Sequence, residues 1–202
     1  ELGRSVKEKI LPIVYKDGRI IRLQQPALPS ESCLLEDPEN TGKIFKIFNR
    51  VGKVGILAAF NLDENESSVT GTVRASDVYG LDEGRYVLFD YFAKTAVVLE
   101  KGQEYSLTLN DYDDFRLFFL LPFIDNVVPF GLLDKYMSPA TFDVLEYGKW
   151  LVHEGGTFCL FSESGKPTVK IGASIINPEP MGDMLYTVDL PDHEMPIIVE
   201  LV

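Results

Sequence analysis

The sequence predicts an all-β fold, an antiparallel β-sandwich with a short helix and a hairpin in front of it. From Lys43 onward the apolar runs are short and regularly spaced, and turn-forming residues separate most of them. The nine Tyr and thirteen Phe also favour strands. This texture is typical of sandwiches and barrels, whereas alternating strands and helices would predict a parallel sheet.

The first 25 residues differ in character from the rest of the chain. Ser5 followed by Glu8 is a capping-box pattern, which predicts a helix near residues 5–11. Pro12 should end or bend that helix early. Asp17-Gly18 is a hairpin turn signal, and the apolar residues after it can return as a strand.

Two apolar runs, Lys43–Asn49 and Val54–Asn61, predict a buried β-hairpin around the short segment Arg50–Lys53. Their apolar residues alternate poorly with polar ones, which indicates strands covered on both faces. We therefore expect this pair in the interior of the sandwich, with Phe60 in the core.

The remaining strands follow from the same pattern of apolar runs between turns. A brief turn is expected near Leu133–Met137, and Asp63–Ser68 and Asn177–Asp183 are expected to be mobile loops. Strands are predicted at 85–92, 94–99, 104–109, 115–121, 126–132, 141–147, 149–153, 157–161, 168–176, 184–190 and 196–201.

Length and charge restrict the class of protein. A chain of 202 residues suits one or two domains with a substantial core. The net charge of −12 disfavours nucleic acid and anionic membrane as partners, but it allows a neutral ligand. No apolar stretch approaches the roughly 20 residues of a membrane span. No secretory signal is visible, so a cytoplasmic location is the expectation.

Cysteine and histidine give weak signals for chemistry. Cys33 and Cys159 lie between hydrophobic or small residues, as buried thiols often do, and a disulfide between them is left open. His153 and His193 lack the nearby ligands that a zinc site needs. Cys159 and His153 could face one another across a turn as a nucleophile pair, but the sequence offers no third, orienting group.

The acidic cluster Asp111, Asp113 and Asp114 could suggest a calcium site. Its spacing does not continue as an EF-hand loop, so a solvated turn is the preferred interpretation. No glycine-rich phosphate loop occurs. We therefore assign no catalytic, metal-binding or cofactor-binding residue to this chain, and we expect no cofactor.

Four aromatic residues are the candidates for a sugar-stacking platform, because an aromatic face can cover the apolar face of a pyranose. Aromatic side chains on strands more often belong to a core, which is the competing interpretation. The four are Trp150, Tyr147, Tyr136 and Phe142.

Several segments, in order along the chain, resemble one enzyme family. The residues PALPSESCLLEDP at 26–38 are similar to the segment that follows the barrel in raffinose synthases and related α-galactosidases. The strand pair at 42–61, VTGTVRASDV at 69–78 and VVPFGLLDKYMSPAT at 127–141 continue the match. The chain thus resembles the C-terminal part of a glycoside hydrolase of family 36, on the branch of archaeal α-galactosidases and plant raffinose and stachyose synthases.

This resemblance implies an enzyme with an N-terminal β domain, a (β/α)₈ barrel and a C-terminal antiparallel sandwich. The family's two catalytic aspartates lie on the barrel, upstream of the matched residues. Residues 1–36 would then be the end of the barrel and a linker, and residues 37–202 the non-catalytic sandwich. The implied partners are the upstream barrel, α-galactoside sugars through the parent enzyme, and a second copy in a homo-oligomer.

The sequence also departs from the plant members of that family. Phe48 stands where they commonly have Trp, and their extended Cys-containing segment after the second strand is missing, which favours a compact microbial hydrolase over a plant transferase. Two alternatives come from other classes. One is a free-standing carbohydrate-binding module, which an exposed aromatic row would favour. The other is a small enzyme with its own cleft of converging carboxylates.

Overall fold

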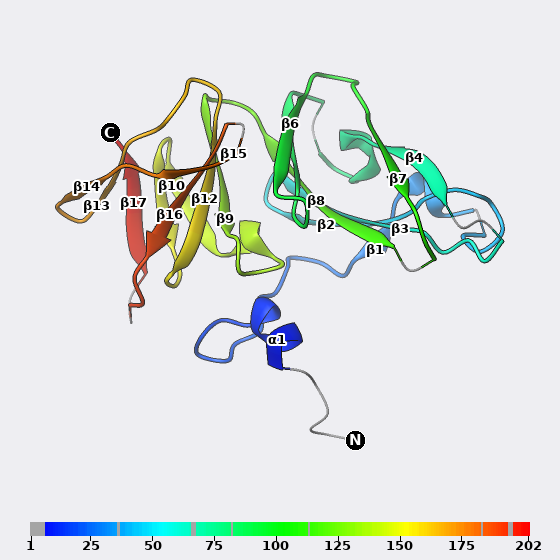
Figure 1. The fold of residues 1–202 in the computed structure, drawn as a ribbon, viewed down its shortest axis with the longest axis horizontal. Helices are drawn as coiled ribbons and strands as arrows, with labels where there is room; N and C mark the ends of the chain where they lie inside the picture. Colours follow the sequence, from blue (N-terminus) through cyan, green and yellow to red (C-terminus); the bar gives the residue numbers. More distant parts are fainter. Residues whose placement is uncertain are drawn as a thin grey trace. The chain divides into compact units, whose positions relative to one another are not determined.

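The computed structural model describes residues 7–35, 37–65, 68–81, 83–112, 114–182, 184–193 and 196–202. The chain divides into two compact units (Figure 1). Unit 1 comprises Glu1–Leu23 and Asp125–Val202, and unit 2 comprises Gln24–Ile124. These units differ from the expected parts, residues 1–36 and 37–202. That expected boundary separates a barrel from a sandwich in the parent protein, and it stays a prediction.

Unit 2 contains a six-stranded sheet and a two-stranded sheet, in which all strand pairs are antiparallel. In spatial order the large sheet is β1 (Leu28–Pro29), β2 (Phe45–Val51), β3 (Val54–Phe60), β8 (Phe115–Pro122), β5 (Tyr86–Asp90) and β6 (Thr95–Leu99). The small sheet pairs β4 (Val69–Val73) with β7 (Tyr105–Leu109).

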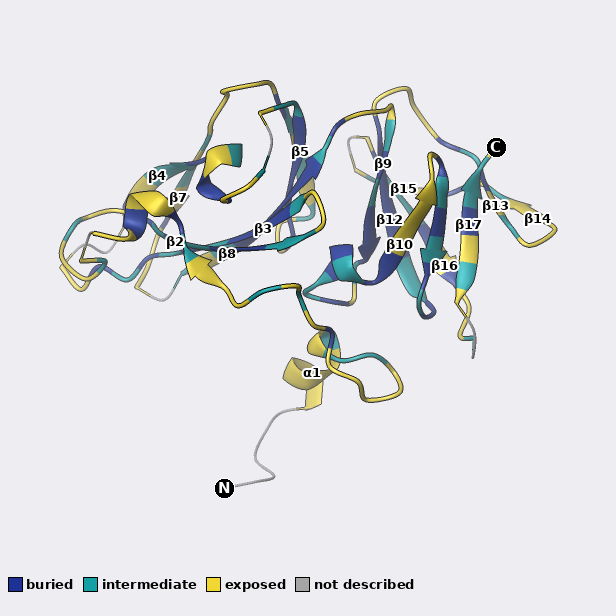
Figure 2. Cartoon of the chain, turned by 180° about the vertical axis from the view of Figure 1, so that it is seen from behind, coloured by how far each residue is buried: buried dark blue, intermediate teal, exposed yellow. Residues whose placement is uncertain are grey.

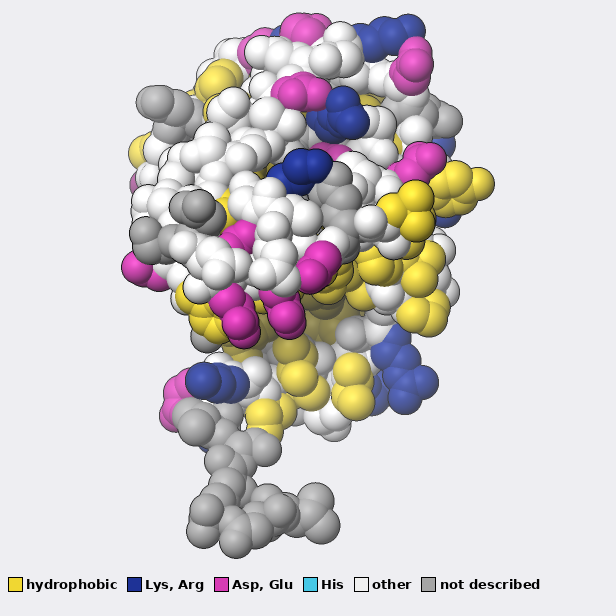
Figure 3. All heavy atoms as spheres, turned by 90° about the vertical axis from the view of Figure 1, so that its right-hand side faces the viewer, with side chains coloured by type: hydrophobic (Ala, Val, Ile, Leu, Met, Phe, Trp, Pro, Cys, Tyr) yellow, Lys and Arg dark blue, Asp and Glu magenta, His cyan; other side chains and the backbone are white. Residues whose placement is uncertain are grey.

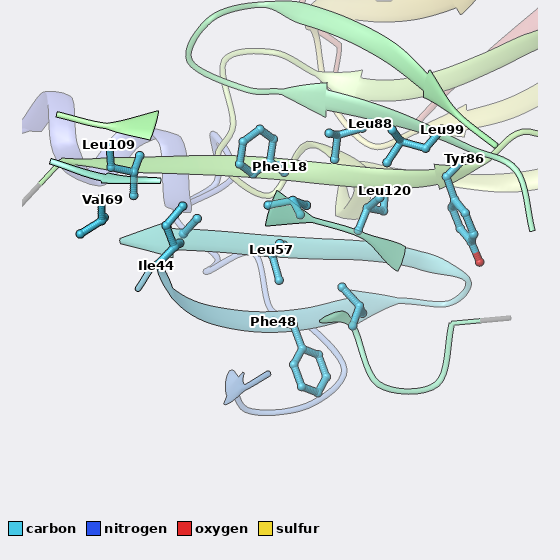
Figure 4. Close-up of a cluster of buried hydrophobic side chains, with 13 residues drawn as sticks. Ile44, Phe48, Leu57, Val69, Tyr86, Leu88, Leu99, Leu109, Phe118 and Leu120 are labelled. Carbon is cyan, nitrogen blue, oxygen red and sulfur yellow. The ribbon is translucent and has the colours of Figure 1, made fainter. Parts of the chain in front are cut away.

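The core of unit 2 lies between these two sheets. Leu57 of β3 and Phe118 of β8 are paired in register and have no exposed surface. Figure 4 shows them in one cluster with Val69 and Leu109 of the small sheet. Burial of such apolar side chains is the main favourable term in folding.

The central strands of unit 2 are buried on both faces. Every residue of β5 is buried, as the dark blue strand in Figure 2 shows. Ile56, Val87 and Phe119, on the face opposite Leu57, are as inaccessible as the core residues. The expectation of covered strands is therefore confirmed for residues 55–57 of β3, whereas β2 mixes buried with partly buried residues. Phe60 is only half-buried and stacks on the exposed Phe115, so its placement in the core was wrong.

Unit 1 contains a five-stranded and a four-stranded sheet, again antiparallel. The first has the order β10 (Phe142–Glu146), β11 (Lys149–Val152), β17 (Ile197–Leu201), β13 (Val169–Ile171) and β14 (Ser174–Ile176). The second has the order β15 (Glu179–Gly182), β16 (Leu185–Leu190), β12 (Gly156–Ser162) and β9 (Val127–Leu132). A separate core, which includes Trp150, Phe158 and Val199, joins the two sheets.

A bulge in β9 shapes the turn that follows it. The register with β12 shifts between Cys159 and Leu160, and Gly131 at this point has a φ of +94°. A Cβ on Gly131 would lie 2.0 Å from the carbonyl oxygen of Ser138, so only glycine fits. The short helix η4 (Ser138–Ala140) can therefore pack directly onto the strand.

The N-terminal segment, residues 7–23, forms a short helix and a tight hairpin. Helix α1 (Lys7–Ile10) continues into the 3₁₀ turn η1 (Leu11–Ile13), which contains Pro12. The hairpin closes through a bridge between Val14 and Ile20, with Gly18 at a φ of +86°. The helix and the hairpin are confirmed. The predicted capping residue Ser5 lies outside the described residues.

The all-β antiparallel class is confirmed, with four differences in the strands. β1 and β4 were not among the predicted strands, the run 168–176 is a hairpin of two strands, and β15 occupies the expected loop Asn177–Asp183. β15 is an edge strand of mostly exposed residues, which is why it carries no apolar pattern.

The surface carries both signs of charge (Figure 3). Exposed ion pairs on unit 2 include Arg74–Glu104 at 2.9 Å and Lys101–Glu83 at 2.6 Å. Pairs of this kind contribute about 0–1 kcal/mol each, so they are not what holds the unit together. Among the described residues, no helix has the length and apolar character that crossing a membrane requires.

Candidate functional site

The candidate site is a polar pocket of about 650 Å³ in unit 1, a volume within the usual range for small-molecule sites. The N-terminal segment supplies one wall and strands β10 and β11, with the residues that follow β11 and β16, supply the rest. The lining residues are Tyr15, Lys16, Asp17, Arg19, Asp143, Leu151, His153, Glu154, His193 and Pro196.

His153 lies at the centre of a hydrogen-bonded row of three side chains. It follows β11, and its backbone N–H donates to the carbonyl of Thr141, just before β10. Asp143 lies two residues after Thr141, on β10, and its side chain is on the same face of the sheet as that of His153. The Nε2 atom of His153 lies 3.0 Å from Oδ2 of Asp143, and Nδ1 lies 3.1 Å from the hydroxyl of Tyr15.

The direction of these hydrogen bonds follows from the groups around them. The Tyr15 hydroxyl donates to the carbonyl oxygen of Ala140 at 2.8 Å, so it is an acceptor toward His153. An ionised Asp143 is also only an acceptor. The row is therefore fully satisfied when both ring nitrogens of His153 carry protons.

Beside this row, a buried ion pair holds the N-terminal segment. Nζ of Lys135 lies 2.9 Å from Oε1 of Glu154, and their side chains are only 5% and 8% exposed. Lys135 also donates to the carbonyls of Leu11 (3.2 Å) and Val14 (2.6 Å). Glu154 Oε2 accepts from the backbone N–H of Lys16 at 2.7 Å. The pair thus fixes the segment by bonds to its backbone.

The pKa values of Tyr15 and Asp17, which both line the pocket, are shifted in opposite directions. Burial raises the pKa of Tyr15 above its ordinary value, and the nearby negative charge of Glu154 adds to the rise. Asp17 accepts hydrogen bonds from the backbone and the side chain of Arg19, which lower the pKa of Asp17. A neutral Tyr15 that already donates to a carbonyl is poorly suited to act as a nucleophile.

The proposed nucleophile pair of Cys159 and His153 does not form. Cys159 is fully buried in β12, and the ring nitrogens of His153 bond to Tyr15 and Asp143. The orienting carboxylate that the sequence seemed to lack is Asp143. Cys33 and Cys159 are both free thiols, so the disulfide that the sequence left open is absent from them.

The predicted aromatic platform is contradicted for two of its members. Trp150 and Phe142 are only 2% and 7% exposed, and their rings pack on Phe158 in the core. Tyr147 is exposed in the turn between β10 and β11, and Tyr136 is partly buried. Successive side chains of a strand point to opposite faces of the sheet, so an aromatic residue that points into the core cannot lie on the exposed face.

The acidic cluster is a turn between β7 and β8, as far as the structure describes it. Burial works against ionisation of Asp114, but donors from Asn110 and Arg116 outweigh it and lower its pKa. Asp113 lies outside the described residues. Within the described part of the chain, no three His, Cys, Asp or Glu side chains are grouped as a metal would need. His193 lines the pocket.

Sequence reasoning missed Tyr15, Lys135 and Glu154. Their bonds to or from the N-terminal segment span separations of more than 120 residues, for example 138 between Tyr15 and His153. No local pattern marks such a pairing. The one available signal was the placement of charged residues, Lys135 and Glu154, next to turns in an otherwise apolar stretch.

Comparison with known proteins gives one consistent family. The family model described as "Raffinose synthase or seed imbibition protein Sip1" matches residues 2–168. A probable galactinol–sucrose galactosyltransferase 1 of Arabidopsis thaliana is 25% identical over 162 residues, covering 67% of this chain. The galactinol–sucrose galactosyltransferase of Pisum sativum is 44% identical over 59 residues, covering 29% of this chain.

The chain spans only a small part of these relatives, 22% of the Arabidopsis protein and 7% of the pea protein in the matched regions. Among solved structures, a putative α-N-acetylgalactosaminidase from Bacillus halodurans matches 41% of this chain and 19% of its own. Its TM-score is 0.35 at 15% identity.

Proposed function

The chain belongs to the raffinose synthase or seed imbibition protein Sip1 family, and from this premise we propose that it is a non-catalytic β portion of a longer enzyme. That enzyme would transfer or hydrolyse terminal α-galactosyl groups. The names of the two plant relatives, both galactosyltransferases, support the reaction class. The small share of the relatives that the chain spans supports the proposal that the chemistry lies elsewhere in the parent.

The observation that carries the proposal is the anchoring of residues 7–23. An upstream catalytic barrel would connect through this segment. The buried Lys135–Glu154 pair and the Tyr15–His153–Asp143 row hold the segment by five hydrogen bonds to its backbone or side chains. A segment fixed in this way would orient the β portion toward the barrel and support it. The barrel is then the chief partner of this chain.

The test uses the longest natural polypeptide that contains this chain, with Lys135→Met as the variant. Loss of the anchor should shorten the half-life of α-galactosyl activity on heating while leaving KM for the galactosyl donor unchanged. Lys149→Met removes a lysine from the more exposed pair with Glu146 and is the matched control. A Lys135→Met enzyme with unaltered heat tolerance would contradict the supporting role, as would a change in KM alone.

A further inference from the structure

The pocket in unit 1 has hydrogen-bonding groups that the anchor does not use. Arg19 bonds to Asp17 through Nε at 2.6 Å, and among the described residues nothing bonds to its two terminal nitrogens. Asp143 bonds to His153 through Oδ2, and its Oδ1 atom likewise accepts nothing from the described part of the chain. A guanidinium donor and a carboxylate acceptor therefore line one pocket with unused bonding capacity.

Both groups already have one contact that directs them toward the pocket. The guanidinium of Arg19 bonds to Asp17 and lies over the ring of Tyr15, with 5.3 Å between Cζ and the ring centroid. Asp143 bonds to His153. These contacts reduce the number of orientations that a ligand would have to select, which lowers the entropic penalty of binding.

The lysine and arginine charges at the pocket are each paired with a carboxylate. Arg19 pairs with Asp17, Lys16 with Asp192 and Lys135 with Glu154, and Asp143 faces His153. An anion would therefore find no unpaired lysine or arginine among these groups. A hydroxyl group both donates and accepts, so adjacent hydroxyls can donate to Asp143 and accept from Arg19 at the same time.

Apolar surface completes the pocket. Leu151 points away from the core of unit 1, since its neighbours Trp150 and Val152 point into it, and it lines the pocket with Pro196. A polyhydroxylated ring has C–H groups that can cover such surface. A volume of about 650 Å³ admits one or two sugar rings.

We propose that this pocket is a binding site for a neutral sugar unit. Arg19 and Asp143 bind neighbouring hydroxyls, and Leu151 and Pro196 contact the ring. The choice of a galactoside as probe rests on the proposed function, but the site itself rests on the pocket.

The test is titration of the ¹⁵N-labelled 202-residue chain with methyl α-galactopyranoside, followed by amide chemical shifts. Saturable shifts should appear in residues 15–19, 143 and 151–154, with a Kd on the order of 1–10 mM, the weak range expected for so small a ligand. Arg19→Gln and Asp143→Asn should each weaken binding about fivefold or more, a loss of one charged hydrogen bond. Arg22→Gln is the matched control, because Arg22 is exposed on the same segment and does not line the pocket. Unchanged spectra elsewhere would show that the variants remain folded.

Three outcomes would overturn the site. They are absence of saturable shifts at these residues, binding that Arg19→Gln and Asp143→Asn both leave unchanged, and tighter binding of galacturonate than of the neutral glycoside. The readout does not depend on catalysis. If the parent enzyme proves not to act on galactosides, the same titration with other neutral sugars still decides the site.

Discussion

At the scale of single residues, the anchor depends on buried charges that are paired. Lys135 has an ion-pair partner and two backbone carbonyls, and Glu154 has the same ion pair and one backbone N–H, which offset the desolvation of each charge. The sequence predicted neither role, because their partners in the N-terminal segment are more than 120 residues away along the chain. It did select His153, but with the wrong partner, since only the register of β10 and β11 brings Asp143 to its ring.

Lys135→Met should lower the free energy of unfolding of unit 1 by about 3–5 kcal/mol, because it leaves Glu154 buried without its cation. The fluorescence of Trp150, the single tryptophan of the chain and part of the core of unit 1, reports this unfolding in urea. Lys149→Met, the control in the more exposed pair, should change the free energy of unfolding by less than about 1 kcal/mol. A loss for Lys135→Met no greater than that of the control would show that the pair is not an anchor.

Tyr15 should make the stability fall at alkaline pH. Its pKa is raised in the folded chain by burial and by Glu154, so above about pH 10 the unfolded state loses the proton first. The folded state then binds more protons, and the free energy of unfolding decreases as pH rises through the folded pKa. Tyr15→Phe should remove this part of the decrease, measured as the difference between the two urea midpoints across pH. Parallel curves for the two proteins would contradict the shifted pKa.

At the scale of elements, the apolar runs and glycine-rich turns carried most of the information about the strands. β2, β3, β8 and β12 were predictable because their apolar residues are close together and bounded by turns. β15 was not, because an edge strand with exposed residues has no such pattern. Phe60 shows where the pattern of apolar residues fails to predict burial. It is the last residue of β3, and an apolar residue at a strand's end is buried only if other elements cover that end.

Gly131→Ala should disrupt the turn between β9 and η4. The new Cβ would meet the carbonyl oxygen of Ser138, and the positive φ adds backbone strain, so a loss of at least about 3 kcal/mol is expected. Gly165 has a similar φ of +99° with nothing within 4 Å, and Gly165→Ala should cost only about 1–2 kcal/mol. The comparison uses Trp150 fluorescence in urea, and equal losses for the two variants would refute the steric argument.

Leu57→Ala should destabilise unit 2 by about 2–5 kcal/mol, because Leu57 is fully buried between the two sheets. Phe60→Ala should cost less, since its ring is only partly buried and stacks on the exposed Phe115. Amide hydrogen exchange in β3 and β8 measures both. A larger loss of stability for Phe60→Ala than for Leu57→Ala would show that Phe60 belongs to the core, as the sequence predicted.

At the scale of the whole molecule, two units with separate cores share one chain, and the N-terminal segment belongs to unit 1. The sequence predicted the class of fold and, by resemblance, the family that the comparison with known proteins shows. It could not predict the pocket, because residues 15–19 reach β10 and β11 only through tertiary contacts. The upstream barrel, a homo-oligomer and a cytoplasmic location stay predictions.

The most direct test of the central claim is a comparison of turnover by this 202-residue chain and by the longest natural polypeptide that contains it. Both are assayed at equal concentration with an activated α-galactoside. We predict turnover by the long polypeptide and none by the chain alone, because hydrolysis or transfer at an α-galactosyl bond requires a positioned pair of carboxyl groups that we place in the upstream barrel. Turnover that purifies with the chain alone, and disappears in Asp143→Asn, would contradict the account and make the pocket an active site.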